Sequence, residues 1–161
     1  VHFKERTITL RGYKFRFSIW DFGYPEFISF VCNDSVAILF IFDLSQISTL
    51  CSIKKWYKQT KNLNKNAIYF LIGTKYDIFK NFEKKIQYDI TNKAYDYVFK
   101  MKASLIFCSS KHSINVVNIF KVILSKYYNL SCKLPEIKEV EDPILEYKNN
   151  LETDIICQKS Y

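Results

Sequence analysis

Two short stretches carry side chains that could recognise a planar ligand. Thr74-Lys75-Tyr76-Asp77 follows an apolar run that contains Gly73, and Ser109-Ser110-Lys111 follows another apolar run 35 residues later. One carboxylate can accept two hydrogen bonds side by side, and guanine offers two adjacent donors, N1–H and its exocyclic amine. Adenine presents an acceptor at N1 and cannot form this pair of bonds. Asp77 is therefore the residue that we expect to read a guanine ring.

The neighbours of Asp77 have complementary roles in this hypothesis. The aliphatic stem of Lys75 would pack flat over the ring while its ammonium holds the loop. A backbone N–H near Ser110 would reach O6 of the base. The predicted guanine site consists of Thr74, Lys75, Asp77, Ser109, Ser110 and Lys111.

A simpler interpretation makes Asp77 the N-cap of a following helix and Lys75 a solvated loop residue. A single T-K-x-D stretch does not decide between the two. A pair of such loops, each directly after a predicted parallel strand, favours a ligand site.

Three apolar runs would position these loops. Residues 36–42 are continuously apolar, which is typical of a parallel strand covered on both faces, and residues 67–72 and 104–108 have a similar pattern. The carboxyl ends of parallel strands meet at one edge of a sheet, where ligands bind in folds of this class. We therefore expect the two loops to lie together.

Helices are predicted between the strands, and a hairpin precedes them. Leu50, Ile53 and Tyr57 share one helix face after the capping-type Ser48-Thr49, and further helices are expected over 83–100 and 116–127. Residues 7–10 and 15–20 alternate about a turn at 11–14. This order predicts an α/β fold, a doubly wound and mostly parallel sheet with an antiparallel edge hairpin.

An acidic tail is expected from residue 134 onward, and residues 144–151 within it are a candidate amphipathic helix.

Charge and cysteine content exclude several classes of protein. Of the 161 residues, 1–130 contain 20 Lys and Arg against 9 Asp and Glu, whereas 131–161 contain 4 against 7. The lysines of the basic body form neither a dense run nor a nucleic-acid motif, so we expect a solvated surface and no nucleic-acid partner. Five widely spaced cysteines without a C-x-x-C pair, and two isolated histidines, predict neither a disulfide framework nor a metal site, and favour a reducing compartment.

Beyond the two loops, a series of short motifs runs through residues 1–135 in a fixed order. With them the sequence resembles the Ras-like small GTPases, and most closely the septum-promoting GTPases of the septation and mitotic-exit pathways. Thr74, where most relatives have Asn, also matches that subfamily. The motifs are Phe17-Ser18-Ile19-Trp20-Asp21, Val31-Cys32-Asn33-Asp34, residues 36–43, Ser48-Thr49-Leu50, Lys55-Trp56-Tyr57, residues 72–77, residues 101–109 and His112-Ser113-Ile114-Asn115-Val116.

The resemblance implies a P-loop GTPase fold that binds GTP or GDP and signals to protein effectors of a kinase cascade. It implies a cytoplasmic protein, with spindle poles or the division site as a further expectation. Cys157 misses the position of a prenylation box, so no lipid anchor motif is expected, as in that subfamily.

Parts of the family pattern are missing from these 161 residues. The phosphates of GTP need a nest of backbone amides and a lysine, supplied by G-x-x-x-x-G-K-[ST], and none of Gly12, Gly23 and Gly73 begins such a stretch. Asp21 and Gly23 match family positions near the phosphates and Mg²⁺, but the catalytic glutamine that should follow is absent. We assign no catalytic residue and no direct metal ligand, and expect Mg²⁺ only in a complete chain. GTP hydrolysis is implied by the resemblance alone.

By resemblance, the missing first strand lies between the strand that ends at Trp20 and the one that starts near Ser35. Without it the two strands must either pair with each other or leave backbone N–H and C=O groups without hydrogen bonds. Each such buried group would reduce the stability of the fold by about 1–3 kcal/mol. We expect a fragment, lacking the first strand, phosphate loop and first helix, with a truncated GTPase domain at 1–133 and a tail at 134–161.

Three functions are compatible with these observations. The first is a GTP/GDP switch of the septum-promoting type, which predicts a phosphate loop encoded upstream of Val1. The second is a pseudo-GTPase scaffold that no longer binds nucleotide, which predicts a start codon near Val1. The third, a nucleic-acid-binding domain, rests on charge alone.

Overall fold

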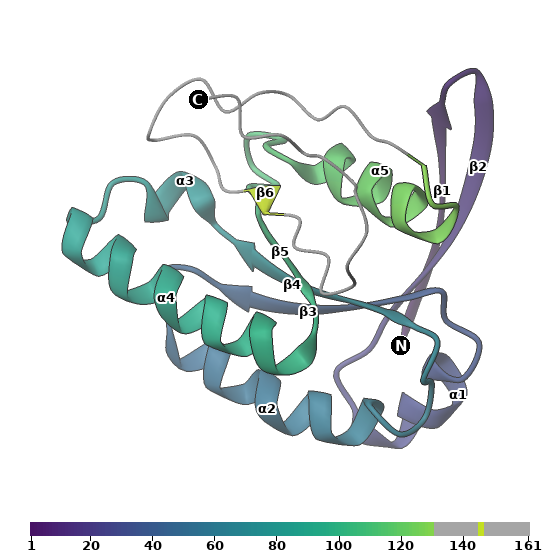
Figure 1. Cartoon of the computed structure of the whole chain (residues 1–161), viewed down its shortest axis with the longest axis horizontal. Coiled ribbons are helices and arrows are strands. Elements are labelled where there is room, and N and C mark those ends of the chain that lie inside the picture. Colours follow the sequence, from purple (N-terminus) through teal and green to yellow (C-terminus); the bar gives the residue numbers. More distant parts are fainter. Residues whose placement is uncertain (131–144, 147–161) are drawn as a thin grey trace.

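The structure is a computed structural model that describes residues 1–130 and 145–146. Its main sheet has the strand order β3-β4-β5-β6, and a separate two-stranded sheet is formed by β1 and β2 (Figure 1). Strands β3 (Ala37–Asp43), β4 (Ile68–Thr74) and β5 (Ser104–Phe107) are mutually parallel. The three predicted parallel strands are thus confirmed, and no strand end differs from its prediction by more than two residues.

Helices cover both faces of the main sheet. Helices α2 (Ser48–Thr60) and α4 (Lys84–Met101) pack on one face, and α5 (Val116–Tyr127) packs on the other (Figure 1). This is the predicted doubly wound α/β arrangement. The structure adds three short elements that the sequence pattern did not predict, 3-10 helix η1 (Pro25–Phe27), α1 (Ile28–Cys32) and α3 (Tyr76–Phe79).

The predicted hairpin is present and longer than expected. Strands β1 (His2–Leu10) and β2 (Tyr13–Asp21) pair in antiparallel register, with Leu10 opposite Tyr13. The two turn residues, Arg11 and Gly12, have φ values of 52° and 82°. Positive φ at both positions defines a turn whose twist matches that of the flanking strands, and glycine adopts it without strain.

Among the described residues, the hairpin is not hydrogen-bonded to the main sheet. Strands β2 and β3 therefore do not pair with each other, so the predicted alternative in which they close up is not what the structure adopts. Aromatic side chains connect the two parts instead, because the Phe17 ring of β2 meets the Phe120 ring of α5 at 5.0 Å between centroids. Phe17 thereby joins the apolar cluster under α5.

Most of the tail predictions lie outside the described residues, including the boundary at 133/134. Leu145–Glu146 forms β6, which pairs in antiparallel orientation with β5. The helix expected over 144–151 is therefore wrong for these two residues. The open edge of β5 offers backbone hydrogen bonds that a weak helical periodicity does not outweigh. Within the described residues, no helix combines the length and apolarity that a bilayer crossing requires.

Candidate guanine-binding site

The first loop begins where β4 ends. Lys75 follows Thr74 in the left-handed conformation, at φ 63° and ψ 34°, and turns the chain directly into α3. The Thr74 hydroxyl donates to the Phe42 carbonyl at 3.0 Å, which ties the start of the loop to β3. Asp77 is the second residue of α3, and Lys75 is its N-cap. The interpretation of Asp77 as an N-cap is therefore wrong.

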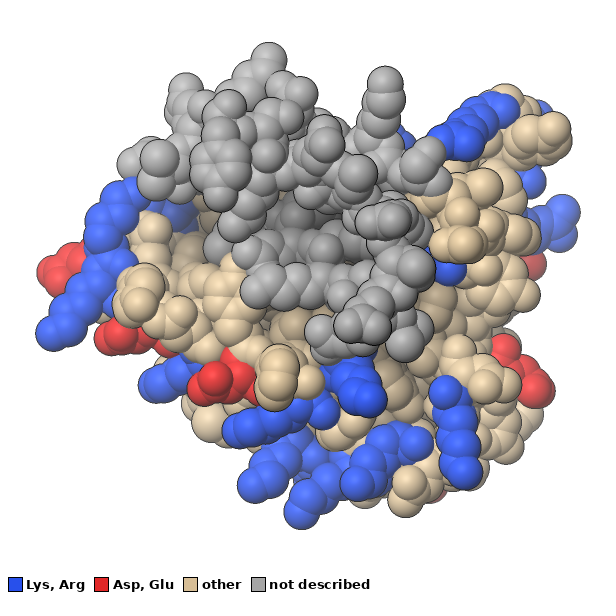
Figure 2. Space-filling model, viewed as in Figure 1, with Lys and Arg blue, Asp and Glu red and all other residues tan. Residues whose placement is uncertain are grey.

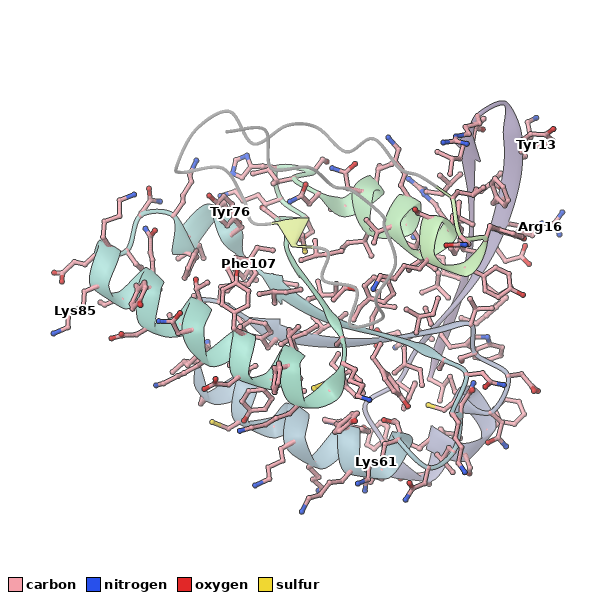
Figure 3. The ribbon with its side chains drawn as sticks, in the orientation of Figure 1. Tyr13, Arg16, Lys61, Tyr76, Lys85 and Phe107 are labelled. Carbon is pink, nitrogen blue, oxygen red and sulfur yellow. The ribbon has the colours of Figure 1, made fainter. Side chains whose placement is uncertain are left out.

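Gly73 leaves room for two buried side chains, Phe107 at the end of β5 and Leu44 directly after β3. A Cβ at this position would lie 2.8 Å from Cδ1 of Phe107 and 2.9 Å from Cδ2 of Leu44. Any side chain here would displace one of these buried neighbours, so the packing requires glycine. Figure 3 shows Phe107 and Tyr76 where β5 and β4 end, and the Tyr76 N–H donates to the Cys108 carbonyl at 3.1 Å.

The second loop closes on itself after β5. Ser109 and Ile114 exchange two backbone hydrogen bonds of 3.1 Å and 2.9 Å, so residues 110–113 form a tight loop. Asn115 then adopts φ 58° and donates from Nδ2 to the Phe107 carbonyl at 2.9 Å. Sequence reasoning did not assign this role to Asn115. The sequence does contain a hint of this role. Asparagine tolerates the left-handed region, and Asn115 directly precedes the apolar residues at helical spacing in 116–127.

One hydrogen bond joins the two loops. The buried Ser109 hydroxyl donates to Oδ1 of Asp77 at 2.7 Å, across 32 residues of sequence. The same hydroxyl accepts the His112 N–H at 3.3 Å. Asp77 is half-buried, and the other residues predicted on the loop surfaces, Lys75, Ser110 and Lys111, are exposed around it. The structure thus brings together all six residues of the predicted guanine site on neighbouring strand ends, and their ligand remains a prediction.

The surroundings of Asp77 favour its charged form. The Ser109 hydroxyl lowers the pKa of the Asp77 carboxyl most, and this outweighs the partial desolvation that raises it. The backbone N–H of Asp77 and the charges of His112 and Lys111 lower this pKa further. At neutral pH the carboxyl is ionised and can only accept hydrogen bonds, which is the form that a pair of base donors requires.

We expect Ser109→Ala to raise the pKa of Asp77 toward its ordinary value, because the largest lowering interaction is lost. The pKa is measured by following the carboxyl carbon of Asp77 by NMR as the pH falls. Since the folded-state pKa is depressed, the stability that Asp77 contributes is present above the unfolded pKa and is lost as pH falls through the folded value. Ser110→Ala is the matched control and should leave the titration unchanged. An unaltered Asp77 titration in Ser109→Ala would show that the hydroxyl does not hold this carboxylate.

The residues predicted near the phosphates lie at the end of the other sheet and just after it. Asp21 ends β2, Gly23 follows it, and both are exposed. Among the described residues, no group of three or more His, Cys, Asp or Glu side chains could hold a metal ion. Mg²⁺ in nucleotide sites is usually held by one or two carboxylates together with phosphates of the substrate, and by the family resemblance Asp21 would be the carboxylate that this chain contributes through water.

A second surface that sequence reasoning did not identify is an exposed aromatic cluster. Phe3 of β1, Trp20 of β2 and Phe30 of α1 are 52%, 42% and 74% exposed. The Phe3 and Trp20 ring centroids lie 4.7 Å apart, and those of Trp20 and Phe30 lie 6.0 Å apart. Three neighbouring exposed aromatic rings are typical of a protein interaction site.

Comparison with known proteins finds one matching family and several similar sequences. Residues 1–129 match the sequence profile of the Ras family. The chain is 54% identical over 151 residues to Septum-promoting GTP-binding protein 1 of Schizosaccharomyces pombe, covering 91% of this chain and 76% of that protein. It is 27% identical over 146 residues to Ras-related protein RabY of Dictyostelium discoideum and 28% identical over 127 residues to human Ras-related protein Rab-12, covering 60% and 50% of those proteins.

Proposed function

Because the chain belongs to the Ras family, we propose that it is a GTP/GDP switch of the septum-promoting type that acts in septation and mitotic-exit signalling. The observation that carries this proposal is the Ser109–Asp77 hydrogen bond, which assembles a base-reading carboxylate from two loops. The 54% identity to a protein named as septum-promoting and GTP-binding supports the choice of subfamily.

In this proposal some residues of the site hydrogen-bond to the edge of the base, and another packs over its ring. Asp77 accepts N1–H and the exocyclic amine of guanine, with the Ser109 hydroxyl fixing the rotamer of the carboxylate. The exposed Lys75 stem lies over the ring, and the backbone N–H of Ser110 donates to O6. Each group acts by hydrogen bonding or packing, so this site supplies specificity for the base.

The proposed output is the binding of protein effectors. GTP would hold segments of the chain in an arrangement that effectors recognise, and hydrolysis would release them. The exposed cluster of Phe3, Trp20 and Phe30 is a suitable docking point, because aromatic residues are enriched at the centres of protein interfaces. Components of a kinase cascade in the cytoplasm, at spindle poles or at the division site are the proposed effectors.

For the 161-residue polypeptide we expect guanine-specific binding that is weak, with a dissociation constant in the millimolar range. The sequence contains no G-x-x-x-x-G-K-[ST], so base contacts act without a phosphate nest. GMP, GDP and GTP should therefore bind with similar affinity, and all three more tightly than AMP. Saturation-transfer NMR at physiological ionic strength measures this, since salt screens the general attraction of the basic body for phosphate.

Two results would contradict this prediction. Micromolar or tighter binding of GDP would mean that other residues hold the phosphates, and equal signals for GMP and AMP would mean that the two loops do not read the base.

The alternative function is a pseudo-GTPase scaffold that binds partners without nucleotide. The observation behind it is that these 161 residues contain no phosphate-loop motif, whereas the exposed aromatic cluster could dock a partner in either function. Sequencing the transcript upstream of Val1 distinguishes the two functions. An encoded phosphate loop favours the switch, and an in-frame stop followed by a start codon near Val1 favours the scaffold.

A further inference from the structure

Helix α2 and the loop after it carry five exposed lysines within twelve residues. Lys54, Lys58 and Lys61 recur at i, i+4 and i+7, which places them along one side of the helix. Lys55 and Lys65 flank this row. We call Lys54, Lys55, Lys58, Lys61 and Lys65 the α2 lysine face.

No acidic residue balances this face locally. The sequence contains no Asp or Glu between Asp43 and Asp77. Within the described part of the chain, none of the five lysines forms an ion pair. Helix α4, the neighbour of α2 on the same face of the sheet, differs because its exposed lysines alternate with Asp89 and Asp96. The α2 lysine face is therefore a concentrated positive surface in a protein of mixed charge.

Helix stability accounts for only part of this pattern. Lysines near the last turn of a helix interact favourably with its dipole, which explains Lys58 and Lys61. Lys54 and Lys55 lie in the middle of α2, and Lys65 lies beyond its end, where the dipole effect is small. Repulsion among five unpaired lysines also opposes folding slightly. An external anion would relieve that repulsion.

The face is prominent and accessible. Helix α2 lies at the outer margin of the molecule, and lysine and arginine side chains gather along the same lower margin of the space-filling view (Figure 2). Lys61 projects there, away from the sheet (Figure 3). The helix runs from the carboxyl end of β3 toward the amino end of β4, so its last lysines lie at the opposite end of the sheet from the guanine loops. A partner at this face leaves the nucleotide site open.

We propose that the α2 lysine face binds the surface of an anionic lipid membrane. A flat array of mobile ammonium groups fits a plane of diffuse negative charge, which requires no shape complementarity. Lysine is a strongly hydrated point charge that lacks the fork geometry of arginine, and it is depleted at the cores of protein interfaces. A specific acidic protein is therefore less well matched to this face than a lipid surface.

The test is a vesicle co-sedimentation assay with the full 161-residue chain at low salt. Vesicles of phosphatidylcholine containing about one third phosphatidylserine should bind the protein, and pure phosphatidylcholine should not. Each lysine near an anionic surface is worth about five-fold in partition coefficient, so Lys54→Gln/Lys58→Gln/Lys61→Gln should lose about 100-fold. The matched arginine variant, Lys54→Arg/Lys58→Arg/Lys61→Arg, keeps the charge and should keep the binding.

A second triple variant controls for net charge. Lys14, Lys80 and Lys85 are exposed and lie outside α2, and Figure 3 shows Lys85 at the start of α4, far from Lys61. Their replacement by Gln removes the same three charges and should reduce binding much less than the α2 variant. Equal losses in the two variants would mean that only total charge matters and would overturn the proposal. The proposal would also be overturned if the chain did not bind anionic vesicles. It would equally be overturned if the α2 variant lost binding to polyglutamate or DNA but kept its binding to vesicles.

Discussion

Replacing Asp77 by asparagine is expected to change the base preference from guanine to xanthine. Xanthine carries an acceptor at position 2, where guanine carries its amine, and the asparagine amide can donate to it. Loss of a hydrogen bond to a charged group costs about 1.5–3 kcal/mol, so the preference for GMP over XMP should fall by about 10- to 100-fold. Saturation-transfer NMR with the two mononucleotides measures the ratio even when binding is weak.

The control for this change is an exposed carboxylate elsewhere. Asp96→Asn on α4 removes the same charge without touching either guanine loop, and it should leave the GMP to XMP ratio unaltered. An unchanged ratio in Asp77→Asn, with the fold intact by circular dichroism, would mean that another group reads the base.

Phe107→Ala is expected to destabilise the protein more than any other single truncation at the base of the site. The ring is completely buried, and its centroid lies 5.5 Å from that of Phe79 in α3 and 6.4 Å from that of Phe42 in β3. Truncating a buried phenylalanine costs about 3–5 kcal/mol. Since domains are stable by about 5–15 kcal/mol, much of the free energy of unfolding would be lost. Urea denaturation measures the change.

Phe99→Ala provides the matched comparison, because the Phe99 side chain on α4 is 78% exposed. Its removal should alter the free energy of unfolding by no more than about 0.5 kcal/mol. Similar losses for the two variants would mean that the Phe107 ring does not pack as described.

The strands of the main sheet were predictable because their composition leaves few alternatives. Residues 36–42 contain no polar side chain, which is typical of a strand covered on both faces. In the structure Ile38, Phe40 and Phe42 are buried in the cluster that includes α2, whereas Ile41 on the other face is 59% exposed. The short helix α3 was not predicted, since four residues show no periodicity. The left-handed Lys75 that starts it has no sequence signature comparable to glycine.

The candidate site was predictable as two loops, because residue types and strand ends are local properties. The roles of individual side chains within the site were harder to predict from the sequence. Asp77 could be read as an N-cap until the structure placed Lys75 in that position. Asn115, which holds the second loop to the Phe107 carbonyl, was overlooked because its contact depends on the exact path of the loop.

The amino-acid sequence by itself determined the class of fold, the order of its elements and the presence of a carboxylate suited to guanine. These features follow from periodicity, apolar composition and side-chain chemistry, which act over a few neighbouring residues. Only the tertiary structure decided that the Ser109 hydroxyl is the partner of Asp77, that β2 and β3 do not pair with each other, and that the α2 lysines are all exposed. These features depend on which distant segments meet when the apolar faces are buried, and no local pattern specifies that.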